Sequence, residues 1–469
     1  MNINSMKHLT IICVFAISFT YLCGSVMAQE AMTLTLDESI QTALKNNPSL
    51  RSAEEKVKTA EQKVNEAKAS FMPSISGSGT YTYLGVIPEV DFDISSLLSG
   101  MGGMPPQGAP SENGTSSSGG GIPLGYEDNY NLGISLQQPL FTWGKISNAY
   151  KQSKYSFEAE KQGLETVKQQ VIFDTTQAFY GVLLTQELVN VTSLAVDQVK
   201  AHVKVAQDLV NAGMATNFDL LRAKVQLANI QSQLIKMQNM QRLAKDGFKM
   251  TAGLNLNAEI NLKGSFTYNP VELELSNLLE IAMRNRSEIK QLDLQEMMGN
   301  KIVSIVKAGN KPNLALAGNY GYQSYADKIG DLFDGDEWEN SWNISLALSV
   351  PIFDGFATKA RVKQAKSAVK QIQIGKEQLT DGITLEVRSA YMNFMEAKEL
   401  LKVQQETVQQ AQESIRIANL QYKNGMLTTV ELMDAELALI QAQTNYTNAL
   451  NDYVVAIAKL EKATASKLN

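Results

Sequence analysis

The sequence contains almost no cysteine or histidine. Both cysteines, Cys13 and Cys23, and one of the two histidines, His8, lie within the first 28 of 469 residues. The other histidine, His202, lies in a stretch rich in Val, Lys and Gln, so we interpret it as a solvent-exposed helix residue. Because a zinc site needs several Cys or His ligands, we expect no metal site in the rest of the chain.

Aromatic residues, at 7%, and charged residues, at 19%, are also scarce for a chain of this length. The length alone would allow two to four domains, but there is little material for several thick globular cores. The chain has 42 basic and 48 acidic residues, a formal net charge of −6, and no basic cluster. This balance excludes a nucleic-acid-binding protein.

Motifs of catalysis and cofactor binding are missing as well. The chain has no P-loop, no dinucleotide-binding glycine motif and no nucleophile elbow. An acidic cluster at 331–339 lacks the spacing of an EF-hand loop, so we interpret it as a solvated loop. We therefore predict a protein that is not an enzyme, with no catalytic residue, no cofactor and no metal.

The N-terminus combines Lys7, an apolar run and a small residue at Ala28, which predicts a secretory signal peptide over 1–28. Lipidation at Cys23 is an alternative, although Leu22 precedes it where a lipoprotein site has a small residue. No later segment has the roughly 18 consecutive apolar residues of a membrane helix. If the exported chain spans a membrane, it must therefore do so as a closed β-barrel.

Proline is absent between Pro139 and Pro270 and again after Pro351. Since an interior proline costs a helix about 3 kcal/mol, these two tracts can hold long helices. Apolar residues recur there every three or four positions, which is typical of coiled-coil packing. One such seam consists of Val387, Ala390, Phe394, Ala397 and Leu401. The sequence thus predicts long helical hairpins over 141–252 and 353–469.

The chain also contains two copies of one unit. Pro73, Tyr81 and Tyr83 recur 239 positions later as Pro312, Tyr320 and Tyr322, whereas Pro139, Glu187, Gly213 and Leu220 recur 212 positions later as Pro351, Glu399, Gly425 and Leu432. The difference of 27 residues is an insertion in the first copy, within a stretch rich in Gly, Ser and Pro. Such internal repeats decide the whole fold.

Between the helical tracts, polar and apolar residues alternate with a period of two. This alternation predicts a β-hairpin over 73–140, with a long outer loop at 84–128, and a second hairpin over 312–352. Strands of about ten residues are long enough to cross an outer membrane at a tilt. The predicted interfacial aromatic belt consists of Tyr81, Tyr83, Tyr130, Tyr320, Tyr322 and Trp342.

Two soluble hairpins packed on a core are the alternative interpretation of these strands. If the strands instead face lipid, four of them leave two open edges, and a single-chain outer membrane barrel needs at least about eight strands. Several copies of the chain would then have to share one barrel.

The two turns between the long helices, at 213–220 and 425–432, have closely matching sequences. Each begins with a glycine suited to the left-handed position that ends a helix. A threonine suited to the N-cap of the next helix follows, and an acid three residues later completes a capping box. These residues are Gly213, Thr216 and Asp219 in the first turn and Gly425, Thr428 and Glu431 in the second.

On these turns, and on the order of its elements, the mature chain resembles the TolC family of outer membrane efflux channels. The resemblance implies a mainly α fold with a transmembrane β part and two internal repeats. It also implies a homotrimer, in which an α-helical barrel joins a 12-stranded β-barrel with four strands from each chain. Residues 29–72 would be the equatorial, helical start of the first copy, and 253–311 the inter-repeat linker and helical start of the second.

The resemblance also assigns roles to the turns, as periplasmic tips. An adaptor would dock on Gly213, Met214, Thr216, Gly425, Met426 and Thr428. The periplasmic gate with its acidic ring would consist of Tyr422, Glu431, Asp434 and Asp219. Leu427 departs from the family, because the best-known members have an arginine there that holds the gate shut. The latch of this chain therefore differs or is weaker.

We predict a passive exit duct in the outer membrane of a Gram-negative bacterium, with the helical part in the periplasm. Its partners would be outer membrane lipid, a periplasmic adaptor (membrane fusion) protein and an inner membrane transporter. Together they would form a tripartite efflux or type I secretion system. The alternative is a secreted coiled-coil structural or adhesive protein. The sequence does not identify the exported substrate.

Overall fold

The computed structural model describes residues 32–87, 89–90, 122–123, 126–266, 268, 271–326 and 338–468. The predicted signal peptide, most of the 84–128 loop and most of the acidic cluster at 331–339 lie outside the described residues. The chain forms two compact units, whose boundaries fall inside long helices. The first contains Met1–Lys58, Ala159–Leu292 and Ile374–Asn469, and the second contains Thr59–Glu158 and Asp293–Gln373.

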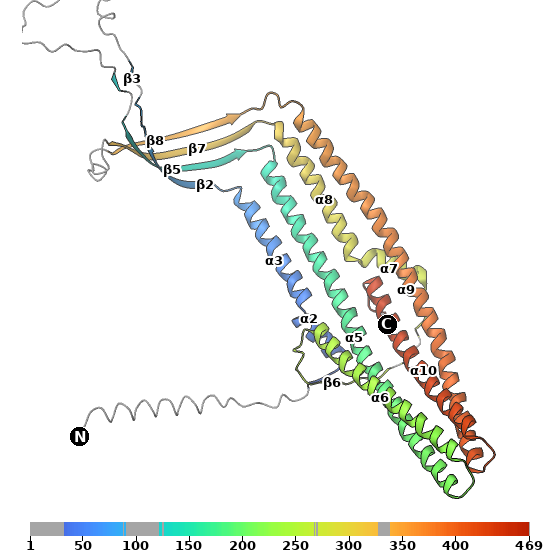
Figure 1. Cartoon of the computed structure of the whole chain (residues 1–469). Helices are drawn as coiled ribbons and strands as arrows, with labels where there is room; N and C mark the ends of the chain where they lie inside the picture. Colours follow the sequence, from blue (N-terminus) through green and yellow to red (C-terminus); the bar gives the residue numbers. More distant parts are fainter. Residues whose placement is uncertain are drawn as a thin grey trace, which may run out of the picture. The chain divides into compact units, whose positions relative to one another are not determined.

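Helices occupy the tracts in which the sequence predicts them (Figure 1). The first copy contains α2 (Leu36–Asn46), α3 (Pro48–Ala69), α5 (Lys145–Asn211) and α6 (Asn217–Ala252), and the second contains α7 (Leu275–Asn285), α8 (Ser287–Lys307), the short η1 (Ala308–Asn310), α9 (Ala357–Lys423) and α10 (Thr429–Thr464). Both α5 and α9 have 67 residues, and both α6 and α10 have 36. A 67-residue helix is about 100 Å long.

The heptad seam predicted in the second tract forms a core of the first unit. Val387, Ala390 and Phe394 on α9 are fully buried. They pack against residues of α7 and α10, and the rings of Phe394 and Tyr453 lie 5.7 Å apart. The alternation of large residues with alanine allows these helices to approach closely, as coiled-coil packing requires.

The first copy has a core of its own. Phe179 and Val182 of α5 pack against Phe248 of α6. A short parallel pair, β1 (Met32–Leu34) with β6 (Ile260–Leu262), contributes to the same cluster. This core anchors the start of the chain to the end of the first helical hairpin.

Among the described helices, α5 is the one that is long and apolar enough to cross a membrane by length and composition. Its most apolar 18-residue stretch has a mean hydropathy of 1.2, although the sequence has no uninterrupted apolar run of that length. Half of this stretch is buried inside the protein, as in a core helix of a helical bundle.

The predicted strands form one four-stranded antiparallel sheet in the second unit, in the order β2-β5-β7-β8. The strands are β2 (Ser74–Tyr83), β5 (Asp128–Phe141), β7 (Asn313–Ala326) and β8 (Trp338–Ser349). The two predicted hairpins join because β5 pairs with β7, with Ile134 opposite Tyr320. A separate short pair, β3 (Glu89–Val90) with β4 (Ile122–Pro123), lies in the first hairpin's connection.

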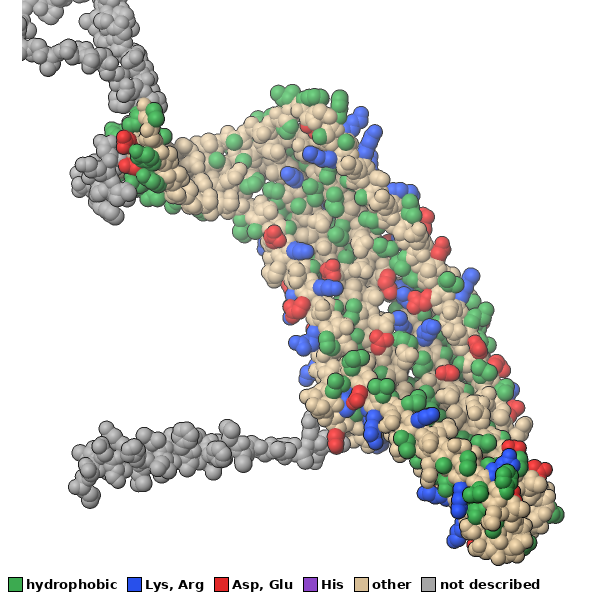
Figure 2. Space-filling model, in the orientation of Figure 1, with side chains coloured by type: hydrophobic (Ala, Val, Ile, Leu, Met, Phe, Trp, Pro, Cys, Tyr) green, Lys and Arg blue, Asp and Glu red, His purple; other side chains and the backbone are tan. Residues whose placement is uncertain are grey.

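The alternative of soluble hairpins packed on a core does not match this sheet. Every residue of β2 is exposed, and so is every residue of β8 after Trp338. Figure 2 shows charged side chains spread over the helical part and few over the sheet. The described part of the chain therefore leaves both faces of β2 and β8 uncovered.

We predict that Gly253→Ala destabilises the protein, because Gly253 ends α6 with a left-handed backbone at φ 67°. A Cβ there would lie 2.6 Å from the backbone C and O of Asn46, and backbone cannot move aside easily. We expect the free energy of unfolding to fall by about 2 kcal/mol or more, measured by denaturation of the purified protein.

The control for this prediction is Gly181→Ala in α5, where an added Cβ meets nothing within 4 Å. Since alanine is the better helix former by about 1 kcal/mol, this variant should be neutral or slightly more stable. Equal destabilisation by both substitutions would contradict the role assigned to Gly253.

Candidate functional site

The two turns between the long helices have the same hydrogen-bonded geometry. Gly213 and Gly425 adopt left-handed backbones, with φ of 74° and 70°. The amide of the residue after each glycine donates to a carbonyl of the preceding helix, from Met214 to Leu209 at 2.8 Å and from Met426 to Gln421 at 2.9 Å. This is the helix-ending motif that the sequence predicts at both turns.

Capping boxes then start α6 and α10. In the second turn the Thr428 amide donates to Oε2 of Glu431 at 2.9 Å, and the Glu431 amide donates to Oγ1 of Thr428 at 3.3 Å. Thr216 and Asp219 form the same reciprocal pair in the first turn. The capping prediction is confirmed for both turns, and the acids at these positions need no partner outside their own turn.

These hydrogen bonds shift the acid–base equilibrium of the second turn. The bonds from the backbone amide and the hydroxyl of Thr428 hold the pKa of Glu431 below its ordinary value of 4.5. The carboxylate is therefore ionised at neutral pH. It lies near the start of α10, where a helix favours negative charge.

Large apolar side chains around the turns are exposed to solvent in the single chain. Met214 is 73% exposed, and Phe218 and Met426 are both 69% exposed. The guanidinium of Arg222 lies 6.0 Å from the ring centroid of Phe218. Each turn therefore presents large apolar side chains that no described residue covers.

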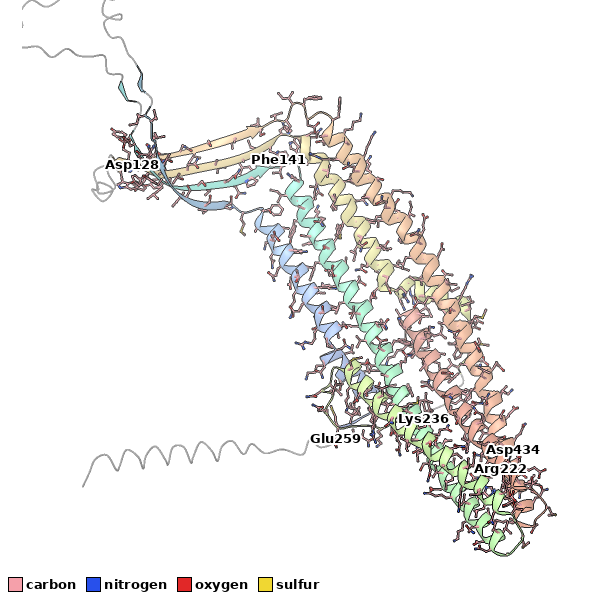
Figure 3. The ribbon with its side chains drawn as sticks, in the orientation of Figure 1. Asp128, Phe141, Arg222, Lys236, Glu259 and Asp434 are labelled. Carbon is pink, nitrogen blue, oxygen red and sulfur yellow. The ribbon has the colours of Figure 1, made fainter. Side chains whose placement is uncertain are left out.

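The four predicted gate residues divide into two kinds. Glu431 and Asp434 are exposed and Asp219 is half-buried, and Figure 3 labels Asp434 close to the turn end of the second hairpin. Tyr422 is buried, with its hydroxyl 3.4 Å from Oγ1 of Thr429. Leu427 packs against the same apolar cluster as Tyr422. The structure thus brings Tyr422 and Leu427 together and leaves the acids at the surface.

The prediction that His202 is solvent-exposed is wrong. This side chain is buried, and its Nδ1 lies 3.4 Å from Oε2 of the equally buried Glu436 on α10. The sequence contained a signal for this placement, because Val199 and Ala206, three residues before and four residues after His202, are also buried. His202 therefore shares the apolar face of α5 with them.

All six predicted belt aromatics lie on one face of the sheet. The register places Tyr81 opposite Tyr130 and Tyr320 opposite Trp342, and the remaining two residues follow at two-residue steps on the same strands. Opposite residues in an antiparallel pair point to the same side of a sheet. Ser, Thr, Asn and Gln alternate with them and occupy the other face.

A second aromatic group lies where the strands end and the helices begin, and the sequence analysis missed it. Its exposed members are Phe141, Trp143, Phe353 and Phe356. Lys311 Nζ lies 5.7 Å from the Trp143 ring centroid, and Lys359 Nζ lies 6.0 Å from that of Phe356. Both Trp143 and Phe356 have left-handed backbones next to a glycine, so the repeated pattern of aromatic residue and glycine was the available signal.

The described residues contain no group of three or more His, Cys, Asp or Glu side chains that could hold a metal ion.

The profile of the outer membrane efflux protein family matches residues 102–247 and 278–466, which is more than half of the chain. The chain belongs to the outer membrane efflux protein family. The resemblance to the TolC family is thereby confirmed, and the alternative of a coiled-coil adhesive protein has no support.

Individual relatives of this efflux protein are distant but cover most of its length. Outer membrane protein TolC of Vibrio cholerae is 21% identical over 341 residues, which span 72% of this chain and 76% of that protein. TolC of Escherichia coli is 21% identical over 431 residues, 90% of this chain and 80% of that protein. The crystal structure of the Campylobacter jejuni CmeC outer membrane channel superimposes with a TM-score of 0.74 at 18% identity, covering 92% of this chain and 85% of that one.

We predict that the second turn of the efflux protein becomes less stable in acid. Because the folded pKa of Glu431 is depressed, its stabilising contribution is complete above the unfolded value and is lost as the pH falls through the folded value. Hydrogen exchange of the 425–432 amides, corrected for intrinsic rates, should therefore accelerate below about pH 4.5.

The control is Glu431→Gln, which keeps a capping-box acceptor but cannot titrate. Its exchange rates should show no such acceleration. If the variant follows the wild-type profile, the acid-sensitive group is not Glu431.

Proposed function

We propose that this chain is the passive exit duct of a tripartite efflux or type I secretion system, assembled as a homotrimer in the outer membrane. The observation that carries the proposal is the four-stranded sheet. It has an apolar face that no part of the described chain covers, and its edge strands β2 and β8 have no further partner in the described chain.

Edge strands are the reason for several copies. Backbone N–H and C=O groups that face hydrocarbon must be hydrogen-bonded, which only a closed sheet achieves. Pairing β2 of one copy with β8 of the next supplies those bonds. Three copies give a 12-stranded barrel, with the two repeats of each chain contributing two strands apiece, and this assembly matches the family resemblance.

Lipid contact is supported by the aromatic groups at both ends of the sheet. The belt of Tyr81, Tyr83, Tyr130, Tyr320, Tyr322 and Trp342 lies toward the loop end, and Phe141, Trp143, Phe353 and Phe356 lie at the helix end. Aromatic residues prefer the two membrane–water interfaces, and Lys311 and Lys359 beside them suit lipid phosphates. The strands between the two groups would cross the hydrocarbon.

The turns would be the periplasmic tips. Each trimer would present six turns of matching geometry, with Met214 and Met426 exposed for an adaptor. The exposed acids Glu431 and Asp434, with the half-buried Asp219, would ring the opening. Rings of carboxylates attract cations and repel one another, so the same groups would favour both cation selectivity and opening.

The proposed duct is tested by mass and conductance. We expect the detergent-extracted protein to have the mass of three chains and to conduct ions in a planar bilayer. A monodisperse single chain in buffer without detergent, giving no conductance, would overturn the proposal.

Disulfide cross-linking tests the closure between β2 and β8. Ser76 on β2 lies level with Asn343 on β8, through Ser135 and Asn319 on the strands between them. Three strand spacings are about 14 Å, too far for a disulfide within one chain. We expect Ser76→Cys to cross-link neighbouring chains with Asn343→Cys.

Because barrel strands are staggered, Ser341→Cys and Ser345→Cys should be tried in place of Asn343→Cys. Single cysteine variants are the control, since each lacks its partner across the edge. Failure of every pair to link chains would argue against the shared barrel.

We predict that Glu431→Gln combined with Asp434→Asn weakens block of the channel by multivalent cations by roughly tenfold or more, because it removes the two exposed charges of the proposed ring. Amides are chosen because Gln preserves the capping box. The measurement is the inhibition constant for such a cation in planar bilayers.

Glu413→Gln is the matched control for the acidic ring. Glu413 is an exposed acid of the same hairpin, and it already pairs with Arg416 at 2.7 Å. Its removal should leave the block unchanged. An unchanged block in the double variant would reject the acidic ring.

A further inference from the structure

A buried polar pair connects the two helical hairpins. Nδ1 of His202 on α5 lies 3.4 Å from Oε2 of Glu436 on α10, and the two side chains are only 3% and 2% exposed. The ring of Tyr422 on α9 meets the His202 ring edge-on, with centroids 5.2 Å apart. Three helices from both copies of the repeat therefore meet at one imidazole.

The surroundings of the pair are apolar. Leu432 and Leu439 lie one turn before and after Glu436 and are buried with Tyr422 in a cluster that also receives Val205 of α5. Nε2 of His202 is buried and has no hydrogen-bond partner among the described residues. A net charge in such surroundings is costly, whereas a neutral pair is not.

No other titratable contact of His202 is recorded in the described chain besides Glu436 and the Tyr422 phenol. The neighbouring charged groups on the three helices that meet here all face solvent. They are Lys200 and Lys204 on α5, Lys423 on α9, and Glu431 and Asp434 on α10. The net charge of the site is therefore set by the pair, which is neutral when it holds one proton.

The pair is not a general requirement of the helical packing. Glu436 corresponds, 212 positions earlier, to Lys224 on α6, and His202 corresponds to Ser414 on α9. Both counterparts are exposed. The chain thus has this buried pair at one of its two equivalent positions, beside the apolar cluster that contains Leu427 and Tyr422.

We propose that His202 and Glu436 form a proton-dependent latch that positions hairpin α5–α6 against hairpin α9–α10 near the tip. With one proton the pair is neutral and the hairpins stay packed. Loss of that proton as the pH rises leaves the carboxylate of Glu436 buried beside a neutral imidazole, and the packing loosens. The inference rests on the proposed duct, in which the same loosening would favour opening of the tip.

The sign of the pH effect in variants identifies the pair. Glu436→Gln removes the acid, so the only buried charge arises when His202 gains a proton, and the packing should loosen as the pH falls. His202→Gln leaves Glu436 as the only titratable group of the pair, so the packing should loosen as the pH rises. The double variant His202→Gln with Glu436→Gln cannot titrate and should be insensitive to pH.

Hydrogen exchange of the full-length assembly in detergent measures the packing directly, between about pH 5 and pH 9. We expect peptides covering 199–206 and 432–439 to exchange roughly tenfold faster or more, after correction for intrinsic rates, when the pair loses neutrality. Lys224→Gln, at the matching position of α6, should behave like the wild type.

Planar-bilayer conductance of the same variants measures opening. We expect the open fraction to rise with pH in the wild type, to rise with falling pH in Glu436→Gln, and to stay constant in the double variant. Absent conductance in every variant would reject the duct, and hydrogen exchange would still decide on the latch. A double variant that keeps the wild-type pH profile, or a Lys224→Gln effect as large as that of Glu436→Gln, would overturn the latch.

Discussion

The sheet's open edges are the constraint on which the rest of the protein depends. β2 and β8 end the order of the four strands, and one face of the sheet carries exposed Ile, Leu, Tyr and Trp side chains. In water that face would aggregate, and in lipid the edges would leave backbone groups without hydrogen bonds. The proposed association with further copies would satisfy both demands, because it would pair the edges and close the sheet.

The helical part, unlike the sheet, buries its apolar residues within the chain. Its helices bury alternating large residues and alanines within the chain, as Val387, Ala390 and Phe394 illustrate. Each hairpin is closed by a turn whose capping box satisfies backbone groups of its own helix.

Burying a charged residue in these seams therefore costs free energy of folding. Glu436 occupies a position at which apolar residues one turn away on both sides are buried, and it meets His202 instead of water. The first copy avoids this cost with an exposed Lys224. Apolar residues would pack at this position as well as the buried acid does, so stability does not account for Glu436. We infer that the acid has a role in the assembly.

The sequence by itself determined the features that depend on neighbours along the chain: periods of two and 3.5, the long proline-free helices, and the glycine, threonine and acid of both turns. It also located the belt aromatics on one strand face, because side chains alternate strictly. Only the tertiary structure decided that β5 pairs with β7 and that His202 faces Glu436 rather than solvent. Both contacts join residues far apart in the sequence, and His202 and Glu436 lie 234 positions apart. The rotation of one packed helix against another decides which residue His202 meets.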